Sequence, residues 1–385
     1  MQHRKWLCLA LGLSACLALN TLSANAEPPV MKDAVTGDAK LKSIEVLSFA
    51  PDGVLLLGDG KGKQVVAVQT GDTTPTKWTK NEIADVKAVL AGRLGAMAKD
   101  IEIKRVAINP QSQTAYIAVR LLSAKPPKDL VMTIDGNGKV KEFSLENVKF
   151  TATQLPADQK VTSVTGVTWA RDRVLVTALA NETFANKCFS IMAPLANDSQ
   201  CGPFTTETYH VAHAAWETKA PIRTMMPYVE NGKNYLVGAF TCTPIVKYSV
   251  DEFKPNEKVK GISVIELGMG NTPQYMFTYE KGGKKYILMN AMRMAQMQKS
   301  NPVGPSEYWT AKVDFNILQE NNKINQNAIW RSGNKNAKAN VNATEKATVV
   351  PTFHGVMHMG QIDSERALAI VKDGNAVNLK VLALP

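Results

Sequence analysis

Short apolar segments separated by glycine- and aspartate-rich turns recur along almost the whole chain. Ser43–Phe49, for example, is followed by the turn Pro51-Asp52-Gly53, and Gln64–Gln69 follows a second turn at Asp59-Gly60-Lys61-Gly62. Runs of β-branched and leucine residues bounded by such turns are typical of β-strands. Six sets of these segments occupy residues 43–69, 105–134, 164–192, 222–249, 274–289 and 360–384. The chain is therefore predicted to be all-β.

The spacing of the six sets predicts a single β-propeller over residues 27–385. Small sheets that are apolar on both faces must stack on one another, and closing the stack into a ring protects the strand edges. Apolar residues make up 45% of the chain, which is enough for a full core. Six blades are favoured, and a seventh stays open for Ser306–Lys346, where the pattern is poor. In a sequential ring, the last blade would lie beside the first.

One insertion, at residues 79–95, has the pattern of a peripheral amphipathic helix. Its apolar residues recur at three- and four-residue steps. They are Ile83, Val86, Leu90 and Leu94. Thr79 and Glu82 have the spacing of a capping box, which predicts that the helix begins there. A second irregular stretch, residues 321–345, is rich in Asn, Lys and Ala, and we expect it to be a surface loop.

The first 26 residues have the features of a secretory signal peptide. A basic start at Arg4 and Lys5 precedes the mostly apolar segment Trp6–Leu19, and Ala24-Asn25-Ala26 has the form of a cleavage site. The apolar segment is too short to span a membrane, and no other segment is apolar enough to do so. We therefore expect cleavage after Ala26 and a periplasmic or secreted protein. A lipoprotein anchor at Cys16 is the alternative.

The formal net charge of the chain is +11, spread over lysines along its whole length. One interpretation of this charge is solubility, and the other is attraction to an acidic surface such as an anionic lipid or polymer. The sequence contains no basic-aromatic motif, so we do not expect a nucleic-acid partner. The expected partner is an exported protein or a small ligand.

Three cysteines follow the predicted cleavage site, namely Cys188, Cys201 and Cys242. In an oxidising compartment, Cys188 and Cys201 are expected to form a disulfide across the short loop between them. Closing such a loop stabilises a fold by about 3 kcal/mol. Cys242 is then an odd thiol close to Pro244, which ends a predicted strand. It is either a metal ligand or nucleophile at a blade mouth, or a plain buried cysteine.

Histidines are scarce, and those after the cleavage site form two pairs, His210 with His213 and His354 with His358. A spacing of four residues places His354 and His358 on one side of the chain in either a helix or a strand. His210, His213 and Glu217 share a face only in a helical turn. Each pair is predicted either to ligate a metal ion or to consist of hydrogen-bonded structural histidines.

Methionines gather near these histidines. Met357 and Met359 flank His358. A further group consists of Met289, Met292, Met294 and Met297. Thioether, imidazole and thiolate together form the soft donor set that selects copper. The sequence therefore predicts copper handling, unless these methionines fill irregular gaps between the blades.

Two metal centres are expected from these residues. The first would bring His210, His213 and Cys242 together at a blade mouth, with Glu217 or Arg223 supporting them. The second would consist of His354, His358, Met357 and Met359. Copper is the preferred ion, and zinc or calcium is the alternative.

Oxygen donors indicate a different chemistry. A divalent-metal-dependent hydrolase or lactonase would place carboxylate and amide oxygens around a calcium ion. The candidates are Asp52, Asp59, Glu217, Asn271 and Asn290. The sequence contains no nucleophile elbow, phosphate loop or zinc-finger spacing. Three function classes stay open, namely a binding or metal-handling propeller, a protein-interaction scaffold, and a hydrolase.

Two passages in the middle of the chain resemble exported bacterial propeller-like proteins of uncharacterised function. The first runs from Tyr209-His210-Val211-Ala212-His213 to Pro221-Ile222-Arg223-Thr224, and the second contains Thr241-Cys242-Thr243-Pro244 and Glu266-Leu267-Gly268-Met269-Gly270-Asn271. Phe49-Ala50-Pro51-Asp52-Gly53 is also similar to blade starts of gluconolactonase-type six-bladed propellers. These resemblances imply a propeller fold and assign no catalytic residue.

Overall fold

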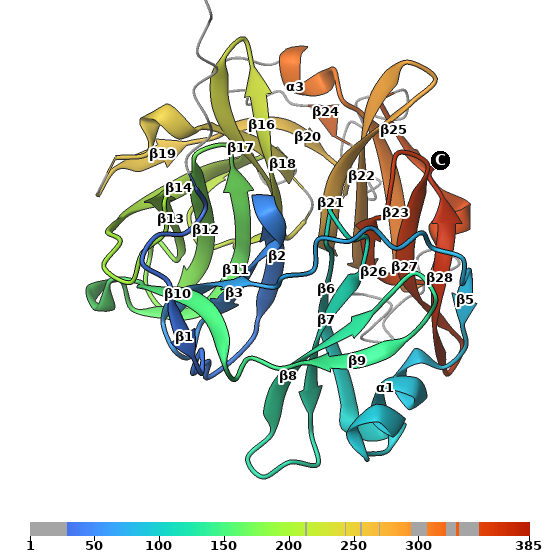
Figure 1. Cartoon of the computed structure of the whole chain (residues 1–385). Coiled ribbons are helices and arrows are strands. Elements are labelled where there is room, and N and C mark those ends of the chain that lie inside the picture. The colour runs from blue at the N-terminus through green and yellow to red at the C-terminus, as the bar shows by residue number, and fades with distance from the viewer. Residues whose placement is uncertain are drawn as a thin grey trace, which may run out of the picture.

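The computed structural model describes residues 29–211, 214–242, 244–254, 256–268, 270–293, 306–320, 329–330 and 346–385. Its strands form six small sheets arranged in a ring (Figure 1). The expected all-β propeller with six blades is thereby confirmed. The N-terminal segment predicted to be a signal peptide lies outside the described residues. Within the described part of the chain, no helix is long and apolar enough to cross a membrane.

The blades are numbered here by the order of their innermost strands along the chain. Blade 1 contains β2 (Val46–Ala50), β3 (Val54–Asp59), β4 (Gln64–Gln69), β10 (Val148–Gln154) and β1 (Val35–Gly37). Blade 2 contains β6 (Ile101–Ile108), β7 (Ala115–Leu121), β8 (Lys128–Ile134) and β9 (Val140–Phe143). Blade 3 contains β11 (Val161–Ala170), β12 (Arg173–Ala180), β13 (Asn186–Met192), β14 (Cys201–His210), β15 (Ala215–Glu217) and β19 (Lys258–Lys260).

The second half of the ring has the same construction. Blade 4 contains β16 (Ile222–Glu230), β17 (Lys233–Phe240), β18 (Pro244–Ser249), β20 (Ile262–Glu266) and β24 (Ile329–Trp330). Blade 5 contains β21 (Asn271–Lys281), β22 (Lys284–Arg293), β23 (Tyr308–Asp314) and β25 (Ala347–Val349). Blade 6 contains β26 (Val356–Gln361), β27 (Arg366–Asp373), β28 (Ala376–Ala383) and β5 (Glu82–Ile83). The stretch considered for a seventh blade contributes strands to blades 5 and 4 instead, as far as its residues are described.

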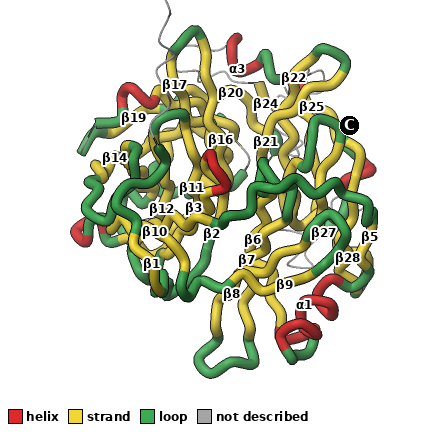
Figure 2. Tube along the Cα trace, in the orientation of Figure 1, coloured by secondary structure: helices red, strands yellow, loops and turns green. Residues whose placement is uncertain are grey.

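The two α-helices of the described chain are α1 (Val86–Leu94) and α3 (Ile317–Glu320). Figure 2 shows α1 in red on the rim of the ring. The predicted capping box at Thr79 and Glu82 is wrong, because Glu82 pairs with Lys380 in the sheet of blade 6 and keeps the chain extended there. The helix begins after Asp85, whose carboxylate accepts a hydrogen bond of 3.2 Å from the backbone N–H of Ala88.

Both faces of each blade are buried, which explains the uninterrupted apolar runs in the sequence. Alternate residues of β3 point in opposite directions. Val54 and Leu56 join an apolar cluster with blade 3, whereas Leu55 and Leu57 join a cluster with blade 2. Four further clusters fill the junctions of blades 3 and 4, 4 and 5, 5 and 6, and 6 and 2. These six clusters hold the ring together.

The blades do not follow one another around the ring in chain order. The inner strand β2 packs between β6 and β11, and β26 packs between β6 and β21. The order around the ring is therefore 1, 3, 4, 5, 6, 2. The expectation that the last blade lies beside the first is wrong, because blade 2 separates them.

Two outer strands explain this order. In the ring, the outer strand of one blade usually leads into the inner strand of the next blade. The short strand β5 completes blade 6 and leads through α1 into blade 2, and β10 completes blade 1 and leads into blade 3. In Figure 1, β5 lies against β28 in blade 6, away from β4 in blade 1, the strand that precedes it in the chain.

Candidate functional site

Each blade contributes its innermost strand to the centre of the ring, and the space along the ring axis is here called the channel. These inner strands are irregular. Five of the six contain a register shift against their neighbouring strand, which is the mark of a β-bulge. The shifts lie between Ile103 and Arg105, Val164 and Gly166, Ile222 and Thr224, Pro273 and Tyr275, and Val356 and His358. A bulge breaks the two-residue alternation and turns a side chain to a new direction. The bulges therefore change which side chains of the inner strands face the axis of the ring.

A cavity of about 140 Å³ lies beside these bulges. Its walls come from β2, β6, β11, β16 and β21, so five blades contribute to it. The polar residues that line it are Ser48, Arg105, Thr165, Thr168, Thr224 and Gln274. Most of these side chains carry hydroxyl, amide or guanidinium donors, and no acidic side chain lines the cavity. The cavity thus presents hydrogen-bond donors and positive charge.

Arg105 crosses the channel from blade 2. Its guanidinium donates hydrogen bonds to the carbonyl oxygen of Gln274 in blade 5, at 2.7 Å, and to that of Arg223 in blade 4, at 3.2 Å. It also lies over the ring of Tyr275, 4.8 Å from the ring centre. Blade 4 lies opposite blade 2 in the ring, so this one side chain joins the two sides of the channel.

Arg223 is an exposed residue that does not line this cavity, and it places a second guanidinium near the first. Its Nε donates a hydrogen bond of 3.2 Å to the hydroxyl of Thr241. Burial of the group and the positive charge of Arg105 both lower the pKa of Arg223. Neither arginine has a carboxylate oxygen within 4.0 Å among the described residues. Two cationic groups therefore stand close together without a neutralising acid.

Tyr275 and His358 form the buried support beneath Arg105. The Tyr275 hydroxyl accepts a hydrogen bond from the backbone N–H of Val106 and lies 2.9 Å from Nδ1 of His358. Burial, and then the charge of Arg105, lower the pKa of His358 to about 3, so the imidazole is neutral at physiological pH. Nδ1 then accepts the tyrosine proton, and a further hydrogen bond joins the imidazole to the backbone of Ile103. This histidine has the structural role that the sequence left open for it.

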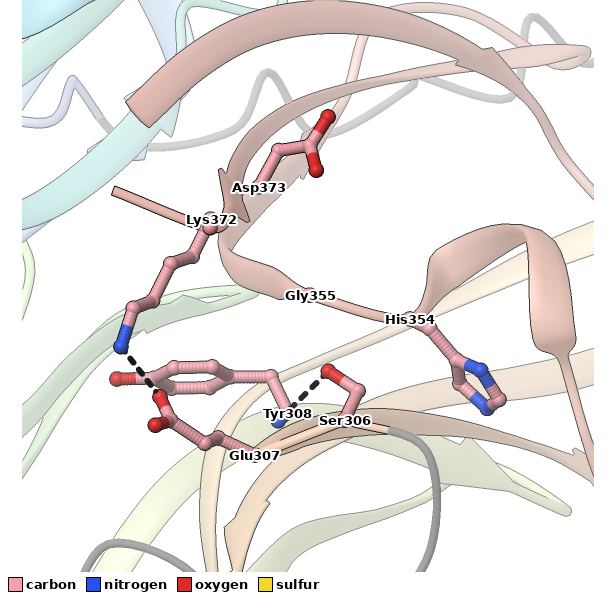
Figure 3. Close-up of a pocket in the computed structure, with 8 residues that line it drawn as sticks. Ser306, Glu307, Tyr308, His354, Gly355, Lys372 and Asp373 are labelled. Atoms are coloured by element: carbon pink, nitrogen blue, oxygen red, sulfur yellow. Dashed lines mark hydrogen bonds and ion pairs between the residues drawn. The ribbon is translucent and has the colours of Figure 1, made fainter. Parts of the chain in front are cut away.

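The second predicted metal centre is not assembled. His354 lines a separate cavity of about 370 Å³, where its ring points away from the ion pair of Lys372 and Glu307 (Figure 3). Met359 is buried in the cluster between blades 5 and 6. Met357 lines yet another cavity, between blades 2 and 6. His354, Met359 and Met357 therefore lie in three separate environments and do not converge on one metal ion.

Two residues of the first predicted centre, His210 and Glu217, lie in blade 3 beside its junction with blade 4. His210 is buried, with Nε2 3.7 Å from a carboxylate oxygen of Glu217 and its ring edge-on to Phe240. Cys242 is half-buried in the turn after Phe240, and its backbone N–H donates to the Asn271 carbonyl oxygen. His213 lies outside the described residues. Within the described part of the chain, no group of three or more His, Cys, Asp or Glu side chains is arranged to hold a metal ion.

The methionine group is divided between core and surface. Met289 is buried in the cluster between blades 4 and 5, in the gap-filling role given as the alternative. Met292 is half-buried near the end of β22. Met294 and Met297 lie outside the described residues.

The expected disulfide is absent, because Cys188 and Cys201 are both free thiols. In the pairing of β13 with β14, Cys188 lies opposite Phe204 and Cys201 lies opposite Ile191. The two cysteines therefore point to opposite faces of blade 3. Cys188 packs against blade 4 and Cys201 packs against blade 1. Short spacing along the chain could not reveal that a sheet separates the two sulfur atoms.

The oxygen donors considered for calcium have other structural roles. The buried Asp59 carboxylate accepts hydrogen bonds from Lys42, Ser43, Gly62 and Gln64, which fix the start of blade 1. Three further candidates also have structural roles within their own part of the fold. Asp52 lies in the turn before β3, the Asn271 amide oxygen accepts a hydrogen bond from Trp309, and the Asn290 amide donates to Val356.

Sequence reasoning missed Arg105 and Tyr275, and it named Arg223 only as a support for Cys242. One signal was present. Lys104 and Arg105 are consecutive cations between the apolar residues Ile103 and Val106 of the strand β6. Such a break in the alternation of polar and apolar residues indicates a bulge. Which blades face Arg105 depends on the ring order, and the sequence pattern did not contain that order.

The fold and the site together define a six-bladed β-propeller with a polar, cationic channel. No protein-family model and no curated protein matches this chain. One solved structure with a similar course of the chain is the major Malassezia sympodialis allergen Mala s 1. The two chains are 9% identical, with a TM-score of 0.39 over 91% of this chain and 96% of that one. Another is GH43B of a Bacteroides ovatus xyloglucan locus, 11% identical, with a TM-score of 0.32 over 74% of this chain and 52% of that one.

Proposed function

We propose that this protein binds a small anionic ligand in the propeller channel. The observation that carries this proposal is the pair of guanidinium groups, Arg105 and Arg223, with no carboxylate within 4.0 Å in the described part of the chain. Guanidinium groups bind oxyanions and carboxylates through paired, charge-assisted hydrogen bonds. An anion between them would relieve their mutual repulsion.

The donors left over in the cavity fit such a ligand. The guanidinium of Arg105 has five N–H groups, and two of its nitrogen atoms donate to the carbonyl oxygens of Gln274 and Arg223. The Ser48 hydroxyl lines the cavity and is buried without a hydrogen-bond partner among the described residues. A buried donor without a partner is costly, and a bound acceptor would remove that cost.

The cavity volume limits the size of the ligand. At about 30 Å³ for each water-sized group, 140 Å³ holds about five such groups. This is the size of a phosphate, a sulfate or a short dicarboxylate. The proposal is therefore a small oxyanion or carboxylate.

Isothermal titration calorimetry with inorganic phosphate, sulfate and malonate tests this proposal. Arg223→Gln should weaken binding of the preferred anion by about 10- to 150-fold, which is the usual value of a charge-assisted hydrogen bond. Arg223 is the better variant because Arg105 also joins three blades. Arg93→Gln, an exposed arginine on α1, is the matched control and should leave binding unchanged. Binding of none of the anions, or equal weakening by both substitutions, would refute the proposal.

The propeller fold itself supports a binding or scaffolding role in general. Export is proposed from the first 26 residues of the sequence. The mass of the protein recovered from its native compartment tests export, because cleavage after Ala26 would give a chain that begins at Glu27.

Copper handling is a separate hypothesis that rests on the soft donors of the sequence. What supports it is the 3.7 Å approach of His210 to Glu217, together with the edge-on contact of His210 with Phe240, which precedes Cys242 by two residues. Metal analysis of protein purified from its native compartment tests this hypothesis. One equivalent of copper that is lost in His210→Ala would support it, and protein without copper would contradict it.

A further inference from the structure

A second cavity, of about 320 Å³, lies between blades 2 and 6 on the side of the molecule that α1 covers. Its walls are mostly apolar. They include Ile101, Ile103, Leu122, Met357, Ile370 and Val377. The sequence analysis placed Met357 in a copper centre, and the structure places it here instead. Apolar walls of this kind favour a ligand with a hydrocarbon part.

The part of the chain that supplies several cavity residues also carries exposed apolar side chains. Six large apolar side chains are exposed in the described chain, and three of them lie between the start of α1 and the residue that follows β7. Their exposed fractions are 38% for Val89, 58% for Met97 and 45% for Leu122. Leu122 itself lines the cavity, so the apolar walls continue onto the surface. An apolar cavity wall that reaches the surface is a feature of binding sites.

Two lysines give this apolar site a charge. Lys87 and Lys99 line the cavity, and neither ammonium group lies within 4.0 Å of a carboxylate oxygen among the described residues. Glu102 is the single acidic residue in the lining. The positive charge therefore exceeds the negative charge where the apolar walls meet solvent.

We propose that this cavity binds a medium-chain carboxylate, with its hydrocarbon chain against the isoleucines and its carboxylate between Lys87 and Lys99. Lysine pairs with a carboxylate as a point charge, and its stem covers apolar surface. At about 30 Å³ for each methylene-sized group, the cavity holds about ten carbons. His358 also lines this cavity and lies 2.9 Å from the Tyr275 hydroxyl beside the channel, so the two sites adjoin. The lysines and the apolar side chains that carry this proposal do not line the channel cavity.

Calorimetric titration with decanoate, below the concentration at which it forms micelles, tests the proposal. Decanoate should bind with one-to-one stoichiometry. Acetate, which has the charge without the chain, and decylamine, which has the chain with the opposite charge, should bind at least tenfold more weakly. Equal binding of acetate and decanoate would overturn the proposal, and so would equal binding of decylamine and decanoate.

Substitutions in the cavity wall test whether decanoate binds there. Lys87→Met combined with Lys99→Met, and separately Leu122→Asp, should each weaken decanoate binding at least tenfold. Lys233→Met changes an exposed lysine at the start of β17 in blade 4; it is the matched control and should bind as the wild type does. Near-ultraviolet circular dichroism verifies that each variant is folded. If the cavity variants fold and bind decanoate normally, the proposal is wrong.

One substitution distinguishes binding in the channel from binding in this cavity. Arg223→Gln should leave decanoate binding unchanged while weakening binding of the small anion. If Arg223→Gln abolishes decanoate binding, the carboxylate binds in the channel and the cavity proposal fails.

Discussion

Protonation of His358 should destabilise this protein below neutral pH. The imidazole is buried, its Nδ1 accepts a proton from Tyr275, and the guanidinium of Arg105 lies over the same tyrosine ring. A proton on His358 would bury a second positive charge beside Arg105 and would break the hydrogen bond to Tyr275. Replacing His358 with Asn should remove this pH dependence, because the amide oxygen accepts the tyrosine proton and does not titrate.

The size of this loss of stability follows from the pKa of His358. Its value is about 3 in the folded protein and 6.5 in the unfolded chain. Between these values the unfolded chain binds more protons, so stability falls as the pH falls. The contribution is fully present above pH 6.5 and is lost completely below pH 3, with a total of about 5 kcal/mol at 1.36 kcal/mol for each pKa unit. Lowering the pH from 7 to 5 should cost about 2 kcal/mol.

Urea denaturation of the wild type and His358→Asn at pH 7 and pH 5 measures this loss. The wild type should lose about 2 kcal/mol more than the variant between the two values. Burial raises the pKa of Glu45, and this group titrates in both proteins, so its effect cancels in the comparison. Equal losses in the two proteins would refute the assignment of a neutral, buried His358.

Three further substitutions or treatments have defined outcomes. Lys247→Ala should cost about 3–5 kcal/mol by urea denaturation, because it leaves the buried Glu230 carboxylate without the ammonium group 2.9 Å away; a cost under 1 kcal/mol would contradict this. Asp85→Ala should lower stability by about 1 kcal/mol through loss of the helix cap, and an unchanged urea midpoint would exclude that role. Alkylation of the unfolded protein without reductant should label both Cys188 and Cys201, and resistance of either to labelling would indicate the disulfide that the structure lacks.

The blades were predictable from the sequence because their signal is local. Gln64–Gln69 was predicted as a strand and forms β4 with the same bounds. An apolar run between turn residues specifies a strand with both faces buried, whatever its neighbours are. The ring order was not predictable, because it depends on β5. This strand has two residues, and only its partner in blade 6 distinguishes it from the start of a helix.

The candidate site was less predictable than the fold. Spacing correctly indicated that His354 and His358 are close in sequence, but it did not show that one lies in a surface cavity and the other inside the ring. A bulge between Val356 and His358 changes the direction of the chain there. Arg105 acquires its role from carbonyl groups more than one hundred residues away, and no local pattern contains that information.

Blades 1 and 6 each combine strands from two separate parts of the chain, and this affects how the protein can fold during synthesis on the ribosome. Ile83 of β5 pairs with Leu379, close to the C-terminus, so the contact joins the first quarter of the chain to its last few residues. Until those residues emerge, the face of blade 2 that packs on Leu368 and Ile370 has no cover. Contacts of such long range form slowly, and intermediates with uncovered apolar surface aggregate readily. A chaperone that binds exposed apolar surface therefore has a target on blade 2 until the ring closes.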